Sequence, residues 1–472
     1  MGREHAHKDR IVLAALCLLA VVLHLPVLGL SFFSDDLSIL YRIGVTGDAG
    51  TGSFFRPLPD WTFWVDHAVV GPRPWFFRLE NVLLLGINGW LVFLLAQRML
   101  AKAGLEKGRV PLLAGLFFVL YPFHNEPQLW IVGRSTAMST GFVLLGLIIA
   151  LGPVGATQRA WGMGLVGLLG AMCYESALLL PIMLVACLPL VPPNERRTWV
   201  PLIVVGGAVV ALNLLARALF TGHVANAYGS AFFTPSLPHF AVRGTKAVAR
   251  LFLPPLDDAH GQMLRAAAVG AGLLIAGLLL HRRARGHRKL MAVLVQLLIV
   301  SSAIATIAGV STRTSEGDRF LYLPSAFLSL AAAVTLGALL RGPWQVAVAA
   351  LLGGCSVAAM HQNHTNWKVA SHTIEAIVQA TPQASAGSRV FIHGLPGDHQ
   401  GAFILRHGFH EALLYAGKDT TNLVRADTLL WSMAGNGALP ALSFEDRDDT
   451  LIIRPQDRIV TWNGRAFVPV PH

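Results

Sequence analysis

The feature that most constrains this chain is a succession of long apolar segments separated by more polar stretches. The first, residues 11–30, has no formally charged side chain and is long enough to cross a bilayer as a helix. Only 13% of the 472 residues are charged, about half the share in a typical soluble protein. Ten more segments follow the first, at 79–99, 110–123, 127–152, 161–173, 176–191, 200–220, 263–280, 290–309, 320–340 and 343–360.

This pattern predicts an all-α polytopic membrane protein with about eleven transmembrane helices, the first of them an uncleaved helix. The third, fifth and sixth segments are short for a full span, so we expect breaks and polar cavities there. We assign residues 1–360 to this transmembrane domain.

The net charge of +11 is compatible with nucleic-acid binding, but membrane topology explains it better. If the N-terminus lies inside, the loops that stay inside hold basic clusters such as Arg196–Arg197, and these clusters account for the whole excess. Nucleic acid is therefore not expected as a partner. The preference for Arg over Lys, with abundant Ala and Gly, hints at a bacterial genome and so at a bacterial inner membrane.

Residues 361–472 differ from the rest because they contain no apolar run of 18 residues. Residues 390–392 have the pattern of a strand, residues 402–416 that of a helix, and residues from 443 onward that of short strands with turns at Asp448–Asp449 and Asn463–Gly464. With eleven spans from an inside start, this tail lies outside. We therefore expect a small periplasmic α/β domain.

Asp35 and Asp36 follow the first apolar segment, where carboxylates are costly unless they are hydrated, paired or used. Neighbouring side chains on a helix or turn point in different directions, so the two acids are expected to have different roles. Two close carboxylates raise the pKa of one of them, which suits a general base. The pair is also able to hold Mg²⁺, Mn²⁺ or Ca²⁺. A hydrated helix end is an equally good interpretation.

His124 and Glu126 lie at a break between two apolar segments, and Arg134 lies two turns further on. A buried Arg needs an anionic partner, either a lipid phosphate or a protein carboxylate such as Glu126 or Glu175. Glu175 is likewise an acid at a turn, between the fifth and sixth apolar segments. Capping of the sixth helix is the favoured interpretation of Glu175.

Arg319 opens the tenth apolar segment, and Arg243, Lys246 and Arg250 share one face of an amphipathic stretch. Arginine binds phosphate through two parallel hydrogen bonds. Snorkelling to lipid headgroups is the ordinary alternative, and it fits Lys246 better than Arg319. We take Arg319, Arg134 and Arg243 as candidate phosphate-binding residues. The sequence has no Walker A loop and no zinc motif.

Six motifs occur in an order that resembles the membrane part of the C-type glycosyltransferases, and in particular the tetratricopeptide-repeat transmembrane O-mannosyltransferases and their bacterial relatives. The motifs are SFFSDD, FFRPL, FRLENVLLLGINGWLV, LFFVLYPFHNEPQLWIVGRSTAM, CYESALLLP and DRFLYLPS. The match in which these short motifs lie extends over most of residues 25–330. The chain departs from the family pattern at Arg78, Tyr121 and Tyr174, where the family has His, His and Lys, and no tetratricopeptide repeats follow.

The resemblance implies the C-type fold, a polyprenyl-phosphate sugar as donor, and inversion at the anomeric carbon. It also implies that Asp35 or Asp36 matches the acidic motif of the first outer loop and that His124 and Glu126 match the His-x-Glu motif of the second. In the same way, Arg134 matches the Gly-Arg that follows, and Asp318 and Arg319 match the Glu-Arg before the Leu-Tyr-Leu-Pro run.

We therefore expect an inverting glycosyltransferase that moves a sugar from a polyprenyl phosphate to an acceptor hydroxyl of a protein, lipid or glycan. Transfer is expected on the outer face of the membrane. Asp35, Asp36, His124 and Glu126 are the candidate catalytic residues, and a divalent cation is possible at the Asp pair. A membrane transporter or lipid flippase is the main alternative, although no inverted repeat supports it. A non-catalytic scaffold is the third interpretation.

Overall fold

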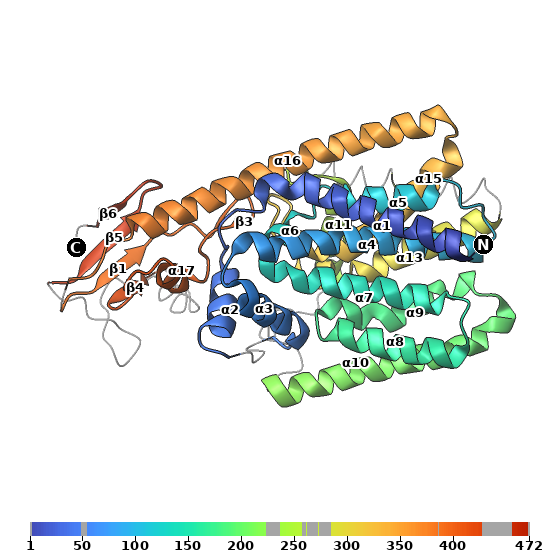
Figure 1. Cartoon of the computed structure of the whole chain (residues 1–472), viewed down its shortest axis with the longest axis horizontal. Coiled ribbons are helices and arrows are strands. Elements are labelled where there is room, and N and C mark those ends of the chain that lie inside the picture. The colour runs from blue at the N-terminus through green and yellow to red at the C-terminus, as the bar shows by residue number, and fades with distance from the viewer. Residues whose placement is uncertain are drawn as a thin grey trace. The chain divides into compact units, whose positions relative to one another are not determined.

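The computed structural model shows a mostly helical chain made of two compact units (Figure 1). One unit comprises Met1–Gly29 and Ile43–Thr365, and the other comprises Leu30–Arg42 and Asn366–His472. The second unit therefore includes residues 30–42, which the sequence analysis assigned to the membrane domain. The structure describes residues 2–48, 54–222, 237–256, 261, 272, 285–385, 387–426 and 456–470.

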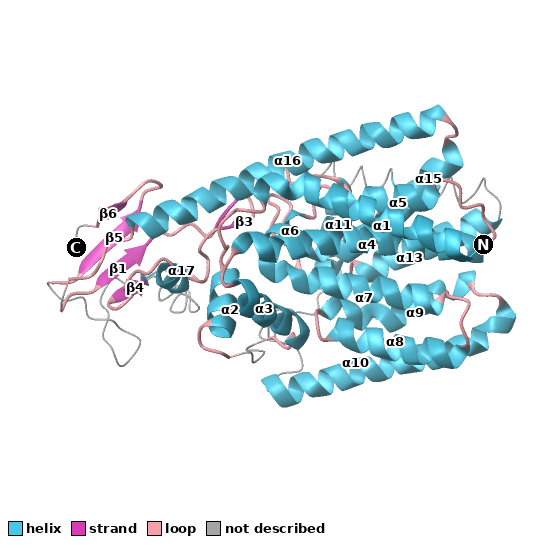
Figure 2. Cartoon of the chain, in the orientation of Figure 1, coloured by secondary structure: helices cyan, strands magenta, loops and turns pink. Residues whose placement is uncertain are grey.

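Helices make up nearly all of the regular structure in the first unit (Figure 2). Proline occupies the first turn of α4, α5 and α10, where its missing N–H costs no hydrogen bond. The helices are α1 (Gly2–His24), α3 (Pro57–Val70), α4 (Pro74–Lys102), α5 (Val110–Val119), α6 (Asn125–Leu129), α7 (Arg134–Ala150), α8 (Ala156–Ala171), α9 (Leu180–Cys187), α10 (Val200–Thr221), α11 (Leu237–Phe252), α13 (Arg285–Ser301), α14 (Ala303–Ala308), α15 (Tyr322–Leu339) and the start of α16 (Pro343–Ala380).

Seven helical segments among the described residues are long and apolar enough to cross a membrane, so the chain is a multi-pass membrane protein. The three segments expected to be short are short: α5 has 10 residues, α8 has 16 and α9 has 8. The total of eleven spans stays a prediction, because the expected helix at 263–280 lies almost entirely outside the described residues. The seven spans are His7–Val27, Pro74–Lys102, Ile131–Ala150, Pro193–Thr221, Gly286–Ala308, Asp318–Leu339 and Pro343–Ala380.

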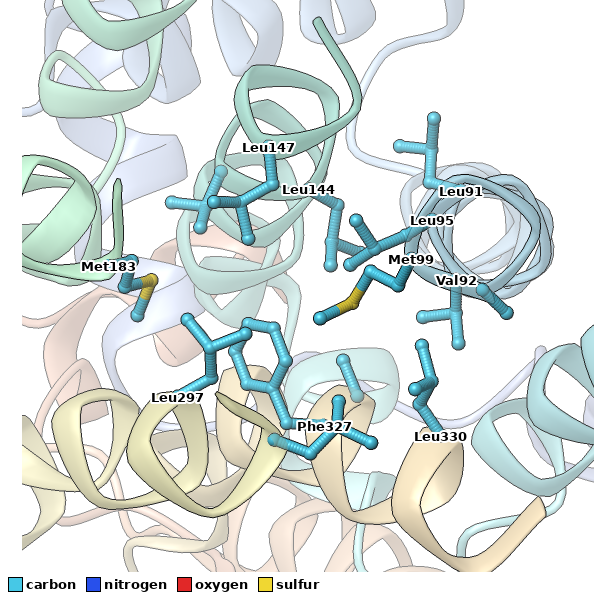
Figure 3. Packing of buried hydrophobic residues seen from close by; sticks show 14 of the residues in the cluster. Leu91, Val92, Leu95, Met99, Leu144, Leu147, Met183, Leu297, Phe327 and Leu330 are labelled. Atoms are coloured by element: carbon cyan, nitrogen blue, oxygen red, sulfur yellow. The ribbon is translucent and has the colours of Figure 1, made fainter. Parts of the chain in front are cut away.

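The core of the helical unit is a continuous apolar cluster to which α4, α7, α9, α13 and α15 all contribute. Figure 3 shows Leu95 and Met99 of α4 facing Leu144 of α7, with Leu297 of α13 and Phe327 of α15 on the other side. Each of these side chains is at most 1% exposed. Because lipid tails are as apolar as these side chains, close van der Waals packing between the helices stabilises this core.

Several predicted helices have different bounds in the structure, and two of them differ in their course. The segment 127–152 is broken at Trp130, whose extended backbone (φ −83°, ψ 116°) separates α6 from a 3-10 turn (η2, Ile131–Gly133) and α7. The last predicted span, 343–360, is part of the 38-residue α16, which continues to Ala380. The residues after 360 are too polar for the hydropathy pattern to include them, yet no Pro or Gly stops the helix before Ala380.

The second unit contains a four-stranded sheet in the order β4–β1–β5–β6. Strand β1 (Val390–His393) pairs in parallel with β4 (Leu423–Arg425) and with β5 (Arg458–Trp462), and β5 pairs antiparallel with β6 (Phe467–Pro469). The predicted strand at 390–392 is confirmed. The predicted helix at 402–416 is shorter, because α17 begins at Phe409 and residues 402–403 form a short strand, β3.

The segment Leu30–Arg42 is packed into this second unit. The Phe33 ring lies 4.8 Å from the Trp367 ring of α16, and Ser31 Oγ donates to Glu375 at 2.8 Å. Both contacts hold the start of α2 (Asp35–Gly44) against the second unit. The expected turn at Asp448–Asp449 lies outside the described residues, and the periplasmic position of this unit stays a prediction.

Candidate active site

Asp35 and Asp36 begin α2 and have different surroundings. Asp36 is fully buried, and its Oδ2 accepts the Phe33 N–H at 3.1 Å. Asp35 is partly exposed. The preceding residue, Ser34, has a left-handed backbone (φ 45°), which turns the chain sharply into the helix. Asp36 therefore stabilises the turn, whereas Asp35 is the acid that solvent or a ligand reaches.

Glu126 and Arg319 form the central ion pair of the helical unit. Glu126 is buried in α6, and Arg319 lies in the 3-10 turn η7 (Asp318–Leu321) that leads into α15. Glu126 Oε2 accepts the Arg319 backbone N–H at 2.9 Å, and Oε1 accepts from the Arg319 guanidinium. Burial raises the pKa of the Glu126 carboxyl, and Arg319 opposes that increase.

Arg319 keeps part of its surface available, since its side chain is 17% exposed. Its guanidinium lies over the Trp130 ring at 5.1 Å and over the Phe320 ring at 4.5 Å. The helix break at Trp130 therefore has a local consequence, because it places this indole beside the arginine. Two aromatic faces and a carboxylate fix the position of a cation that a ligand is still able to reach.

His124 lies in an aromatic cage next to this pair. Its ring centroid is 4.7 Å from Phe118 and 4.4 Å from Tyr322. Ser325 Oγ donates to the Tyr322 carbonyl at 2.7 Å, so the 2.7 Å contact between His124 Nε2 and Ser325 Oγ has the imidazole as donor. Burial lowers the pKa of His124 well below its usual value. A neutral, enclosed imidazole favours a structural role.

Asp318 pairs with Arg250, at 2.5 Å between Oδ1 and Nη2, and both residues are buried. Arg250 also donates to the Leu253 and Ser311 carbonyls, at 2.6 and 3.0 Å. This pair ties α11 to the turn that carries Arg319. Of the predicted basic face of α11, only this last arginine is fully buried.

Arg134 lies buried at the start of α7 and is surrounded by protein partners. Its Nε donates to Asn81 Oδ1 at 3.0 Å, and its Nη2 donates to the Phe77 carbonyl at 3.1 Å. Its Nη1 forms ion pairs with Asp66 and with Glu80. These partners join α3, α4 and α7, so the environment favours a structural role for Arg134.

Arg243 is partly exposed on α11 and donates from Nη1 to the Ile307 carbonyl at 2.9 Å. Lys246, one turn further on, is exposed. Among the candidate phosphate ligands, Arg319 and Arg243 are therefore more accessible than Arg134.

A second cationic cluster, around Glu175, was not predicted from the sequence. The Glu175 carboxylate pairs with Arg56 at 3.1 Å and with Arg217 at 3.2 Å, so two cations share one anion. Arg56 also lies over the Tyr174 ring at 4.4 Å. The predicted capping role is therefore incomplete, because Glu175 connects three distant segments. Arg56 belongs to the FFRPL motif, which was the available signal.

Glu126 and Glu175 thus pair with arginines other than Arg134, and the two protein partners predicted for Arg134 are wrong. Within the described part of the chain, no group of three His, Cys, Asp or Glu residues is arranged to hold a metal ion. A divalent cation at Asp35 and Asp36 stays a prediction.

The fold and these clusters define a multi-pass helical membrane protein with ion-paired arginines at the ends of its helices. Comparison with known proteins then gives its relatives. Residues of this chain are 29% identical over 222 residues to the protein O-mannosyl-transferase Tmtc1 of Drosophila melanogaster, covering 42% of this chain and 25% of that protein. They are 33% identical over 118 residues to TMTC2 of Mus musculus, covering 24% and 13%.

The resemblance predicted from the motifs is confirmed, because these curated relatives are O-mannosyl-transferases. The chain spans a quarter or less of their length. No family model matches the chain.

Two solved structures are similar over most of the chain. The arabinofuranosyltransferase AftD from Mycobacteria has a TM-score of 0.48 and 16% identity, covering 88% of this chain and 33% of AftD. ArnT from Cupriavidus metallidurans in the apo state has a TM-score of 0.38 and 13% identity, covering 97% and 94%.

Proposed function

We propose that this chain is an inverting glycosyltransferase that moves a sugar from a polyprenyl-phosphate donor to an acceptor hydroxyl. The observation that carries the proposal is the Glu126–Arg319 pair, in a chain that is 29% identical over 222 residues to an O-mannosyl-transferase. A guanidinium held by a buried carboxylate and still partly exposed suits the binding of a phosphate.

Arg319 binds the donor phosphate in this proposal. As the glycosidic bond breaks, negative charge develops on the departing phosphate, and a fixed cation beside it lowers the barrier. The Glu126 carboxylate positions Arg319 by accepting hydrogen bonds from the backbone N–H and from the guanidinium of Arg319. Arg243 is a second phosphate ligand, whereas Arg134 keeps its protein partners and holds the helices together.

Asp35 acts as the general base. It removes the proton from the acceptor hydroxyl as that oxygen attacks the anomeric carbon, which forms the new glycosidic bond and inverts the configuration. Asp36 shapes the turn that presents Asp35. A divalent cation at this acid pair would add positive charge near the reacting groups, and no step depends on it.

We place the reaction on the outer face of a bacterial inner membrane, with the N-terminus inside. The apolar spans support membrane insertion, and the basic inner loops support this orientation. The donor tail lies in lipid, and the acceptor approaches from water.

Transfer by the purified chain in vesicles tests the proposal. Wild type is given polyprenyl-phosphate mannose with a radiolabelled sugar, and a membrane extract as the source of acceptor. We expect the label to move from the lipid donor to an acceptor in the extract. Asp35→Asn is expected to lose transfer by about 10²–10⁴-fold. The matched control is Asp48→Asn, at an exposed acid outside α2.

Vesicles that contain a fluorescent polyprenyl phosphate separate this proposal from the transporter alternative. Movement of the lipid between leaflets without any sugar transfer would overturn the enzyme assignment. Full transfer by Asp35→Asn would reject Asp35 as the base.

A further inference from the structure

The second unit contains a cavity of about 420 Å³ that none of the steps above uses. This volume is within the range of small-molecule sites, about 300–1,000 Å³. Its polar lining comes from Ser38 of α2, the loop before α17, α17 itself and the end of β4. The polar residues are Ser38, Arg406, His407, His410, Glu411 and Arg425.

The loop that lines the cavity is fixed against the start of α2. The His407 N–H donates to Ser34 Oγ at 3.1 Å, and the Ser34 N–H donates to the Ile404 carbonyl at 2.8 Å. Gly408 has φ 75°, and a Cβ at this position would lie 2.5 Å from the Ser34 carbonyl oxygen. Only glycine fits this approach, so the wall of the cavity is a built feature.

The charged lining is mainly basic. Arg425 Nη1 donates to the Arg406 carbonyl at 2.9 Å, which places the two arginines side by side. Arg406 also pairs with Asp398, at 3.1 Å, yet its side chain stays 38% exposed. Glu411 is the acid of the lining, against two guanidiniums and two imidazoles. Such a lining attracts an oxyanion, because guanidinium groups bind carboxylate and phosphate strongly.

The cavity is also lined by α2, the helix that begins with Asp35. Ser38 is one turn from Asp35, and residues i and i+3 of a helix share a face. A ligand whose anionic group is held by Arg406 and Arg425 therefore lies against α2, one turn from Asp35.

We propose that this cavity binds an acceptor that carries an oxyanion, a carboxylate or a phosphate, and orients one of its hydroxyls toward Asp35. The proposal rests on the glycosyltransferase function proposed above, and it specifies the acceptor class. Affinity comes from the two guanidiniums of Arg406 and Arg425.

Calorimetric titration of the purified full-length chain tests this site with three probes: glucuronate, glucose 6-phosphate and neutral glucose. We expect at least one anionic probe to bind about tenfold or more tightly than glucose. If glucuronate binds more tightly than glucose 6-phosphate, the cavity recognises a carboxylate. If glucose 6-phosphate binds more tightly, it recognises a phosphate.

Arg425→Gln and Arg406→Gln are each expected to weaken binding of the anionic probe by about tenfold and to leave the affinity for glucose unchanged. Arg425→Lys retains the charge and is expected to keep most of the affinity. The matched control is Arg465→Gln, in the turn between β5 and β6 outside the cavity. Thermal unfolding of each variant shows that the second unit is still folded.

Equal affinity of wild type for all three probes would overturn the proposal, and so would unchanged anion binding in an Arg406→Gln and Arg425→Gln double variant. Asp35→Asn separates this proposal from the previous one, because it is expected to abolish transfer and to retain probe binding. If transfer proceeds in wild type while no anion binds, only the acceptor class is wrong. If anions bind and Asp35→Asn still transfers sugar, the assignment of Asp35 as base is wrong.

Discussion

Glu126 accepts two hydrogen bonds from Arg319, one from its backbone N–H and one from its guanidinium, although 193 residues separate them in sequence. The carboxylate thereby fixes both the turn before α15 and the side chain that this turn carries. A single buried acid thus connects a helix break in the first half of the chain with a cation in the second half.

Glu126→Gln is expected to reduce transfer because the amide cannot balance the charge of Arg319 or accept both of its hydrogen bonds as strongly. We expect kcat/KM for the lipid donor to fall by about 10–100-fold, within the range for lost electrostatic contacts at a site. Steady-state transfer over a range of donor concentrations measures it. Glu106→Gln, at an exposed loop acid, is the control, and equal losses in both variants would refute a specific role for Glu126.

The raised pKa of the Glu126 carboxyl should make the stability of the chain depend on pH. Burial raises the pKa of Glu126 above its usual 4.5, so the folded chain binds this proton more readily than the unfolded chain. The contribution of Glu126 to the free energy of unfolding therefore falls as pH rises from about 4.5 to the raised pKa. Unfolding temperatures of wild type and Glu126→Gln across that interval measure the effect. We expect wild type to lose more stability than the variant, and parallel curves would contradict the assignment.

Substitution of Asp35 should affect mainly sugar transfer, whereas substitution of Asp36 should affect mainly stability. Asp36→Asn weakens the capping of the Phe33 N–H and is expected to cost about 0.5–2 kcal/mol of stability. Asp35→Asn is expected to lower the unfolding temperature less than Asp36→Asn does, while abolishing transfer. Thermal unfolding and transfer assays on the two variants measure this split. A larger stability loss in Asp35→Asn than in Asp36→Asn would reverse the two roles.

Arg134 should matter for folding more than for donor binding. Arg134→Gln leaves Asp66 and Glu80 without their cation, and removing one partner of a buried ion pair costs about 3–5 kcal/mol. We expect a markedly lower unfolding temperature in detergent. Arg243→Gln, at a partly exposed arginine, is the comparison and should change the unfolding temperature little. Equal unfolding temperatures for wild type and Arg134→Gln would show that Arg134 is free for a ligand.

Hydropathy was sufficient to predict the helical membrane class, because long uncharged segments leave the backbone only helical solutions in lipid. It also identified the three short helices. The break at Trp130 was not predicted, since hydropathy treats residues 127–152 as one apolar segment and tertiary packing decides where such a segment bends. The extension of α16 to Ala380 was missed for the opposite reason, because a polar helix has no hydropathy signal.

The candidate residues were found by their positions next to helix ends, but their partners were not. Arg134 pairs with Asp66 from the first polar loop, and Glu175 pairs with Arg56 from the same loop. Such pairings join segments about 70 to 120 residues apart. They depend on how the helices pack, and that packing cannot be predicted from a single sequence. The inclusion of residues 30–42 in the second unit is another result of packing.

The anomeric configuration of the transferred sugar is the most direct test of the central proposal. Wild-type chain is given a polyprenyl-phosphate sugar of known configuration and the acceptor, and nuclear magnetic resonance of the product gives the one-bond C–H coupling at the anomeric carbon. Direct attack by an acceptor oxygen deprotonated by Asp35 predicts the opposite configuration to that of the donor. A product with the donor's own configuration would contradict single-step transfer.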